Sequence, residues 1–338
     1  MVGTQPYDKV KAVNNTALGY YILSPLEFKK YYDNPTESVG DWYDVGSAIH
    51  CLILQPEDFY DKYIVLDYKK PQNEQQKVFI EKYCDFLSLK KEEELLDTKS
   101  NDTFLLEAYK VAYSTKGKTD KKMLEEATEL QTNLNSYMQF IRLELNGRTI
   151  LSSGSMESVK QCCNALLVNP KSDLVIKTPE LKGDDIKVYN ELEIYFDFKG
   201  MHCKSRLDKL IIDKPNRKIY IVDIKTTSKP VGKFYESFRD YDYERQFAFY
   251  CLAVYEYLDK QIGVPSLDEY SVTCICATVS TKEPYESRIY GLPMEKVMFS
   301  VQNIKRVLTD LVWHFENNKW NYPKCYYEGG NDYEVLEY

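Results

Sequence analysis

Ile221-Val-Asp-Ile-Lys-Thr-Thr227 is the most informative segment of this 338-residue chain. Apolar and polar residues alternate in it, which is typical of a strand with one buried face. Asp223 and Lys225 are two residues apart, so both project from the same face, while Val222 and Ile224 face the core. The stretch therefore predicts a buried strand that carries a carboxylate and a lysine side by side.

A second carboxylate lies on the preceding predicted strand. Residues 203–212 read as that strand, and Asp213-Lys-Pro-Asn216 reads as the turn that follows it. Residues 209–222 hold the rest of the two strands and the turn between them. A connection of this length can place Asp208 beside Asp223 at one end of the sheet. An alternating segment over residues 189–198 comes before both strands, so we expect a three-stranded meander.

The rest of the pattern predicts a mixed α/β (α+β) core with a helical N-terminal elaboration. We expect one compact unit over 1–338, with a mostly helical part over 1–170, a βββαβ core over 171–290, and a C-terminal helix and tail over 291–338. The expected helices run from Ser24, and over 48–54, 73–88, 102–114, 120–145, 155–167, 234–258 with a break near Tyr241, and 295–317, and a fourth strand covers 270–280.

Composition argues against several classes of protein. No apolar run reaches about 18 residues, the length that a membrane-spanning helix needs. The N-terminus lacks the basic-then-apolar order of a signal peptide, so we expect a cytoplasmic protein. Nine cysteines without a Cys-x-x-Cys pair predict buried reduced thiols, and argue against a disulfide framework, a zinc ribbon or an iron–sulfur centre.

Charge is distributed unevenly along the chain. The net charge is −8, but residues 199–245 hold twelve Lys/Arg and seven Asp/Glu, a local +5 that leaves −13 for the rest. A basic segment on an acidic body suits a local nucleic-acid channel. A solvated surface would give the same charge pattern, so charge alone leaves both interpretations open.

The three polar residues of the two strands suggest metal chemistry. Two neighbouring carboxylates repel each other unless a cation lies between them, and oxygen ligands favour Mg²⁺ or Mn²⁺. An adjacent lysine can orient water or stabilise charge on a phosphate. Gln246 and Tyr250 lie four residues apart, on one face of the following helix. The alternative interpretation of Asp223 and Lys225 is an exposed salt bridge.

Three motifs together resemble the PD-(D/E)xK nuclease superfamily. They are Cys203-Lys-Ser-Arg-Leu-Asp208, the strand from Ile221 to Thr227, and Gln246-x3-Tyr250. The chain is most similar to the RecE-type exodeoxyribonuclease VIII catalytic domain of phages and prophages, whose upstream motif stands here as Gly46-Ser-Ala-Ile-His50. The resemblance covers about residues 15–280, and Leu207 replaces the proline that usually precedes the first aspartate.

The resemblance implies a restriction-endonuclease-like fold and a role for each motif residue. The implied metal ligands are His50, Asp208, Asp223 and the backbone carbonyl of Ile224. Lys225 is expected to activate water, while Gln246 and Tyr250 hold the nucleophile or the phosphate. The alternative for His50 is a packed core residue. For Glu191 and Glu193, an exposed strand face is the preferred interpretation.

The implied activity is Mg²⁺- or Mn²⁺-dependent exonuclease digestion of linear double-stranded DNA, from 5′ to 3′, in phage-type recombination. A ring-shaped homo-oligomer and a single-strand-annealing protein are the implied partners, in a bacterial cytoplasm if a phage encodes the chain. The candidate phosphate contacts, each of which can equally be a solvated surface residue, are Lys204, Arg206, Lys229 and Arg245. An endonuclease, a repair nuclease or a catalytically inactive DNA-binding scaffold on the same fold remain as alternatives.

Overall fold

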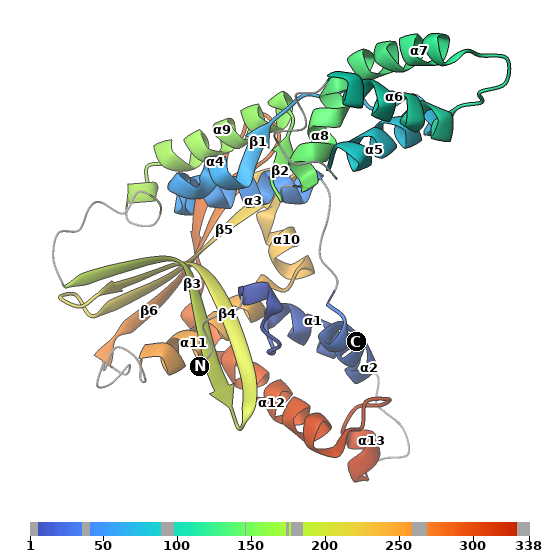
Figure 1. Cartoon of the computed structure of the whole chain (residues 1–338). Helices are drawn as coiled ribbons and strands as arrows, with labels where there is room; N and C mark the ends of the chain where they lie inside the picture. The colour runs from blue at the N-terminus through green and yellow to red at the C-terminus, as the bar shows by residue number, and fades with distance from the viewer. Residues whose placement is uncertain are drawn as a thin grey trace. The chain divides into compact units, whose positions relative to one another are not determined.

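The computed structural model in Figure 1 describes residues 6–35, 41–88, 98–145, 147–173, 176, 185–258 and 269–329. Two compact units are distinguished. The first comprises Met1–Gly40, Leu52–Gln55 and Lys160–Tyr338, and the second comprises Asp41–Cys51 and Pro56–Val159. The domain boundaries that we predicted from the sequence stay a prediction.

A five-stranded mixed sheet forms the core of the first unit. Its strands, in spatial order, are β3 (Ile186–Phe198), β4 (Met201–Asp213), β5 (Lys218–Thr227), β6 (Ser271–Ser280) and β7 (Ser287–Gly291). Neighbouring strands run antiparallel except for β5 and β6, which are parallel. The predicted meander and fourth strand are confirmed, as is the mixed α+β fold class. Strand β7 was missed because its short Ser-Arg-Ile-Tyr-Gly sequence has no clear alternation.

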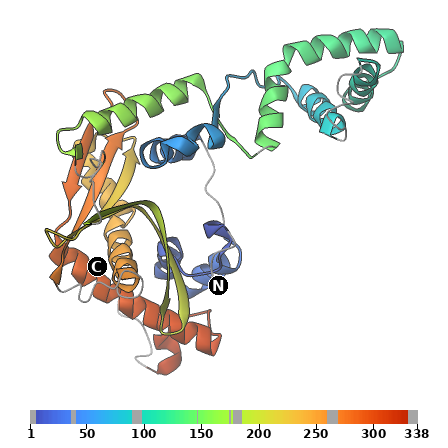
Figure 2. The same cartoon turned by 60° about the vertical axis from the view of Figure 1, so that its left-hand side comes forward.

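The hairpin of β3 and β4 extends beyond the rest of the sheet. Both strands have 13 residues, but β4 pairs with β5 only from Lys209 to Asp213. The hairpin curves strongly away from the other strands, as Figure 2 shows. The first half of β4 is thus left without β5 as a neighbour, and the N-terminal segment of the chain occupies that side.

Helices of the first unit cover the sheet. Helix α11 (Tyr243–Tyr257) packs against β3, β4, β5 and α12 (Met294–Asn317). The predicted break near Tyr241 is confirmed: α10 (Phe234–Asp240) ends there, and Asp242, with φ +51°, caps α11 through the amide of Arg245 at 3.4 Å. Eight consecutive residues of α11, from Phe247 to Val254, are buried, which fixes this helix firmly.

Two short helices precede the sheet in the first unit. Asn14 caps α1 (Asn15–Leu23), and Ser24 caps α2 (Pro25–Asp33), with Pro25 at its first position as the sequence predicted. Helix α1 contacts α11. A single helical turn, α13 (Cys325–Glu328), follows α12.

The second unit is largely helical. It includes α4 (Phe59–Lys62), β1 (Tyr63–Val65), α5 (Glu74–Ser88), α6 (Thr98–Ala112), α7 (Asp120–Asn133), α8 (Asn135–Leu145) and β2 (Thr149–Leu151), and β1 pairs in parallel with β2. Helices α3 (Asp41–Leu54) and α9 (Ser153–Val168) each carry residues of both units. The expected single helix over 120–145 is two helices that meet at Leu134, which is buried against a core of residues such as Phe79, Ile80 and Tyr109.

Two further properties concern the residues that the structure describes. Among them, no helix is both long and apolar enough to cross a membrane. Eight of the nine cysteines are buried and Cys325 is exposed.

Candidate active site

Asp208 lies where the pairing of β4 with β5 ends. The last paired residues are Lys209 and Val222. One position further, a side chain makes the contact between the two strands in place of the backbone. Oδ2 of Asp208 accepts a hydrogen bond of 2.7 Å from the backbone amide of Ile224. The side chain is thereby fixed against β5, directly beside Asp223, as the length of the turn predicted.

Asp223 and Lys225 form a close ion pair on the next strand. Nζ of Lys225 lies 2.6 Å from Oδ2 of Asp223, and their side chains are 15% and 1% exposed. The alternative of an exposed salt bridge is therefore wrong. The ammonium also lies 4.6 Å from the centre of the Tyr243 ring. Burial lowers the pKa of Lys225, but the negative charges of Asp223 and Asp208 outweigh it and raise the pKa, so the side chain stays charged.

Gln246 and Tyr250 hold the other oxygen of Asp223. The amide of Gln246 donates to Oδ1 at 3.3 Å, and the hydroxyl of Tyr250 donates to the same atom at 3.2 Å. Nε2 of Gln246 also lies 2.6 Å from the Tyr250 hydroxyl. Burial and the nearby carboxylates raise the pKa of Tyr250, so it remains a proton donor. Both residues thus position a carboxylate, a function that the sequence motif did not specify.

Glu191 joins this group, although the sequence favoured an exposed position. One of its carboxylate oxygens and one of Asp208 lie within 4.8 Å of each other. Glu191 has φ +49° and lies between Asn190 and Leu192, which both pair with β4. Such a backbone conformation is uncommon for a residue with a side chain and often marks a functional site. Glu193 is exposed, as expected, and accepts a hydrogen bond from Tyr195.

The predicted phosphate contacts have different surroundings. Lys204 is 5% exposed and donates to two backbone carbonyls, which gives it a structural role. Arg245 is bound to Asp242 and to Asn15 and is mostly buried. Lys229 is 42% exposed, with Glu236 3.3 Å and Asp240 3.7 Å away.

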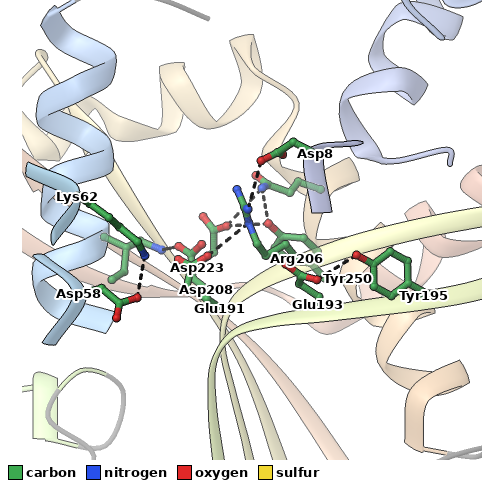
Figure 3. Close-up of polar contacts among 12 residues, drawn as sticks. Asp8, Asp58, Lys62, Glu191, Glu193, Tyr195, Arg206, Asp208, Asp223 and Tyr250 are labelled. Carbon is green, nitrogen blue, oxygen red and sulfur yellow. Dashed lines mark hydrogen bonds and ion pairs between the residues drawn. The ribbon is translucent and has the colours of Figure 1, made fainter. Parts of the chain in front are cut away.

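Arg206 is also 42% exposed, and it lies next to the carboxylates. Its Nε is 3.4 Å from Glu191, and an Nη atom is 3.9 Å from Asp8 (Figure 3). Arg206 thus contacts the acidic group through its ion pair with Glu191. The DNA-binding role of all four stays a prediction.

All four predicted metal ligands, His50 and Ile224 among them, remain predictions. His50 is half-buried on α3, in the second unit. Ile224 is buried and contributes its amide hydrogen to Asp208, while its carbonyl is the predicted ligand.

The residues of the first unit suit a hard divalent cation. Three carboxylates (Glu191, Asp208 and Asp223) gather with two cations (Lys225 and Arg206), so the group has an excess negative charge. Each carboxylate oxygen carries two lone pairs, so the hydrogen bonds described above are compatible with metal binding. Magnesium–oxygen distances of about 2.0–2.1 Å allow one ion to bind neighbouring carboxylates. The donor set thus fits Mg²⁺ or Mn²⁺.

A mixed sheet with this acidic group and lysine at the junction of two strands defines a protein of the PD-(D/E)xK superfamily. Residues 29–328 match the model of a family described as a PDDEXK-like domain of unknown function (DUF3799), and the chain belongs to that family. The predicted superfamily is thus confirmed, while the likeness to RecE-type enzymes in particular stays a prediction.

Chains of solved structures are similar to this one. The crystal structure of a "Putative exonuclease" from Eubacterium rectale is similar, with a TM-score of 0.43 and 10% sequence identity over 99% of this chain and 97% of that chain. No curated protein matches.

Proposed function

We propose that this protein is a metal-dependent nuclease that hydrolyses DNA phosphodiesters. Membership of a PDDEXK-like family supports nuclease activity. The observation that carries the proposal is the fixed arrangement of Asp208, Asp223 and Lys225: one carboxylate is bound by the backbone of β5, and the other is bound by a charged lysine. Burying these charges costs desolvation free energy unless opposite charges and hydrogen bonds compensate it. A role of the charges in catalysis would explain why they are buried.

The catalytic contributions divide between the residues. Asp208 and Asp223 would hold a Mg²⁺ or Mn²⁺ ion, with Glu191 as a further acidic ligand. Such an ion would supply polarisation of the phosphate and a lower pKa for a coordinated water. Lys225 presents a positive charge to the attacking water and the phosphate. Gln246 and Tyr250 keep Asp223 in one orientation, which reduces the reorganisation that the reaction requires.

We include His50 in the metal site on the strength of its motif, Gly46-Ser-Ala-Ile-His50. A neutral imidazole is a common partner of carboxylates in metal sites.

Exonuclease action from 5′ to 3′ on linear duplexes is proposed from the resemblance to RecE-type enzymes. The same resemblance supports a ring-shaped oligomer, a single-strand-annealing partner and a role in phage-type recombination. The basic segment of residues 199–245 supplies candidate phosphate contacts. Because such contacts are weakened by salt, activity is expected to fall steeply between about 50 and 200 mM salt.

The test is a degradation assay on linear duplexes labelled at the 5′ or 3′ end, with closed circular DNA alongside and Mg²⁺ present or absent. We expect Mg²⁺-dependent loss of one of the two end labels, and only from linear DNA. Asp223→Asn is expected to abolish it, while Asp197→Asn, an exposed substitution on β3, is the control. Cleavage of circular DNA would indicate an endonuclease, and absence of both hydrolysis and Mg²⁺ binding would indicate an inactive scaffold.

A further inference from the structure

The N-terminal segment Tyr7–Val13, here called the strap, lies along the half of β4 that β5 leaves uncovered. Its end pairs in parallel with Cys203: the amide of Val13 donates to the carbonyl of His202 at 2.9 Å, and the amide of Lys204 donates to the carbonyl of Val13 at 2.8 Å. The strap thus acts as a short additional strand beside β4.

A buried lysine fastens the other end of the strap. Nζ of Lys204 donates to the carbonyl of Tyr7 at 2.7 Å and to that of Val10 at 2.8 Å. It also lies 4.4 Å from the centre of the Tyr7 ring. Burial lowers the pKa of Lys204, and a buried ammonium is costly unless its donors are used. The two carbonyls and the ring together offset that cost, and so fix the backbone of Tyr7.

Tyr7 in turn lies against Arg206. The guanidinium carbon of Arg206 is 4.9 Å from the centre of the Tyr7 ring, a distance typical of a cation–π contact. Glu191 and Asp8 flank the same guanidinium (Figure 3). An arginine side chain has many rotamers, and a contact of this kind restricts them. The strap therefore sets the orientation of an arginine whose other partner, Glu191, belongs to the acidic group.

The two ion pairs of Arg206 differ in distance and in exposure to solvent. Glu191 is 20% exposed and 3.4 Å from the guanidinium, whereas Asp8 is 70% exposed and 3.9 Å away. An exposed ion pair at that separation contributes little to stability. A phosphate can bind a guanidinium through two parallel hydrogen bonds, which is considerably stronger. Asp8 is thus the partner that a phosphate can displace.

We propose that Tyr7 is a positioning residue, which holds Arg206 ready to bind a backbone phosphate next to the metal-binding carboxylates, and that Asp8 is the partner that this phosphate displaces. In the absence of DNA, Asp8 forms an ion pair with the guanidinium of Arg206. A phosphate then replaces Asp8, while the Tyr7 ring keeps the guanidinium in place. Both residues lie outside the 29–328 segment that the family model matches. The proposal rests on the proposed function.

The test measures the affinity of the full chain for a short duplex without hydrolysis, by fluorescence anisotropy in Ca²⁺ over a series of salt concentrations. Tyr7→Ala is expected to weaken binding about 10-fold, because the guanidinium loses the ring that orients it toward the phosphate. Tyr7→Phe is expected to bind like the wild type, since the ring and not the hydroxyl makes the contact. Asp8→Asn is expected to bind about 3-fold more tightly, whereas the control Asp197→Asn, also exposed, leaves affinity unchanged.

A double-mutant cycle separates positioning from general destabilisation. Arg206→Gln alone and Arg206→Gln with Tyr7→Ala are expected to bind equally weakly, because Tyr7 acts only through Arg206. Additive losses, or an unchanged affinity in Tyr7→Ala and Asp8→Asn, overturn the proposal. Tyr7→Leu keeps the volume without the π face and serves if Tyr7→Ala does not fold. The binding readout needs no hydrolysis, so absence of nuclease activity contradicts the proposed function alone.

Discussion

The backbone amide of Ile224 donates a hydrogen bond of 2.7 Å to Oδ2 of Asp208. The backbone of β5 thus holds a candidate catalytic carboxylate of the neighbouring strand β4. Asp208→Asn keeps an acceptor for this bond, whereas Asp208→Ala leaves a buried amide without it. The alanine variant is therefore expected to lose about 1–3 kcal/mol in the free energy of unfolding, and the asparagine variant much less. Chemical denaturation measures both. Both are expected to lose Mg²⁺-dependent hydrolysis, and equal stability of the two variants would contradict the role of the bond.

Tyr250→Phe tests the support of Asp223. The variant removes one hydrogen bond to a buried carboxylate, of a type that contributes about 1.5–3 kcal/mol. We expect hydrolysis to fall about 10- to 100-fold with a weaker apparent affinity for Mg²⁺. Metal titration of the rate measures both effects. The conservative Tyr255→Phe, on the same helix but facing Met298, is the control, with unchanged kinetics expected.

Glu191 and Glu193 form a matched pair on β3. Glu191→Gln is expected to weaken Mg²⁺ binding and to lower activity at least about 10-fold, because a charged ligand becomes neutral. Glu193→Gln is expected to behave like the wild type, since its carboxylate is exposed. Isothermal calorimetry with Mg²⁺ gives the affinities. Similar losses in the two variants would exclude a specific role for Glu191.

The pair of Lys225 and Asp223 makes a prediction about stability. Lys225→Met leaves Asp223, which is 1% exposed, without its cation. Breaking a buried ion pair in this way typically costs about 3–5 kcal/mol, while neutralising both partners costs less. The double variant Lys225→Met with Asp223→Asn is therefore expected to unfold at higher denaturant concentration than Lys225→Met alone. Both variants are expected to be inactive, and a single variant as stable as the wild type would contradict this account.

Thiol reactivity tests the packing of the cysteines. Burial raises the pKa of Cys276 and Cys203 to about 12, so neither forms a thiolate at neutral pH. Cys325 is exposed. We expect a maleimide to label one thiol per native chain and nine after denaturation, as measured by mass spectrometry. Cys325→Ser is expected to remove the native labelling, and rapid labelling of further thiols would show that the core opens.

The sequence predicted the centre of the site well, because it depends on local periodicity. Asp223 and Lys225 share a face wherever a strand forms, and a short turn brings Asp208 beside them. Gln246 and Tyr250 share a face of a helix for the same kind of reason. Their actual partner is Asp223, and the sequence gives no indication of which polar group a helix face meets.

Other features depend on contacts between distant parts of the chain. Lys204 looked like a phosphate contact because it is a lysine in a basic segment, but a segment almost 200 residues upstream covers it. Glu191 looked exposed because alternation assumes regular strand geometry, and a left-handed residue departs from that geometry. No pattern in the sequence distinguishes it from Glu193.

The left-handed conformation of Glu191 has an evolutionary consequence. Glycine adopts φ near +50° without steric cost, so replacement of Glu191 by glycine is neutral or favourable for the backbone at that position. Natural drift can therefore remove this carboxylate from a descendant while selection on folding leaves the substitution unopposed. Related chains with the same fold can then differ in catalytic activity. The residue at the position of Glu191 predicts that activity better than the fold does.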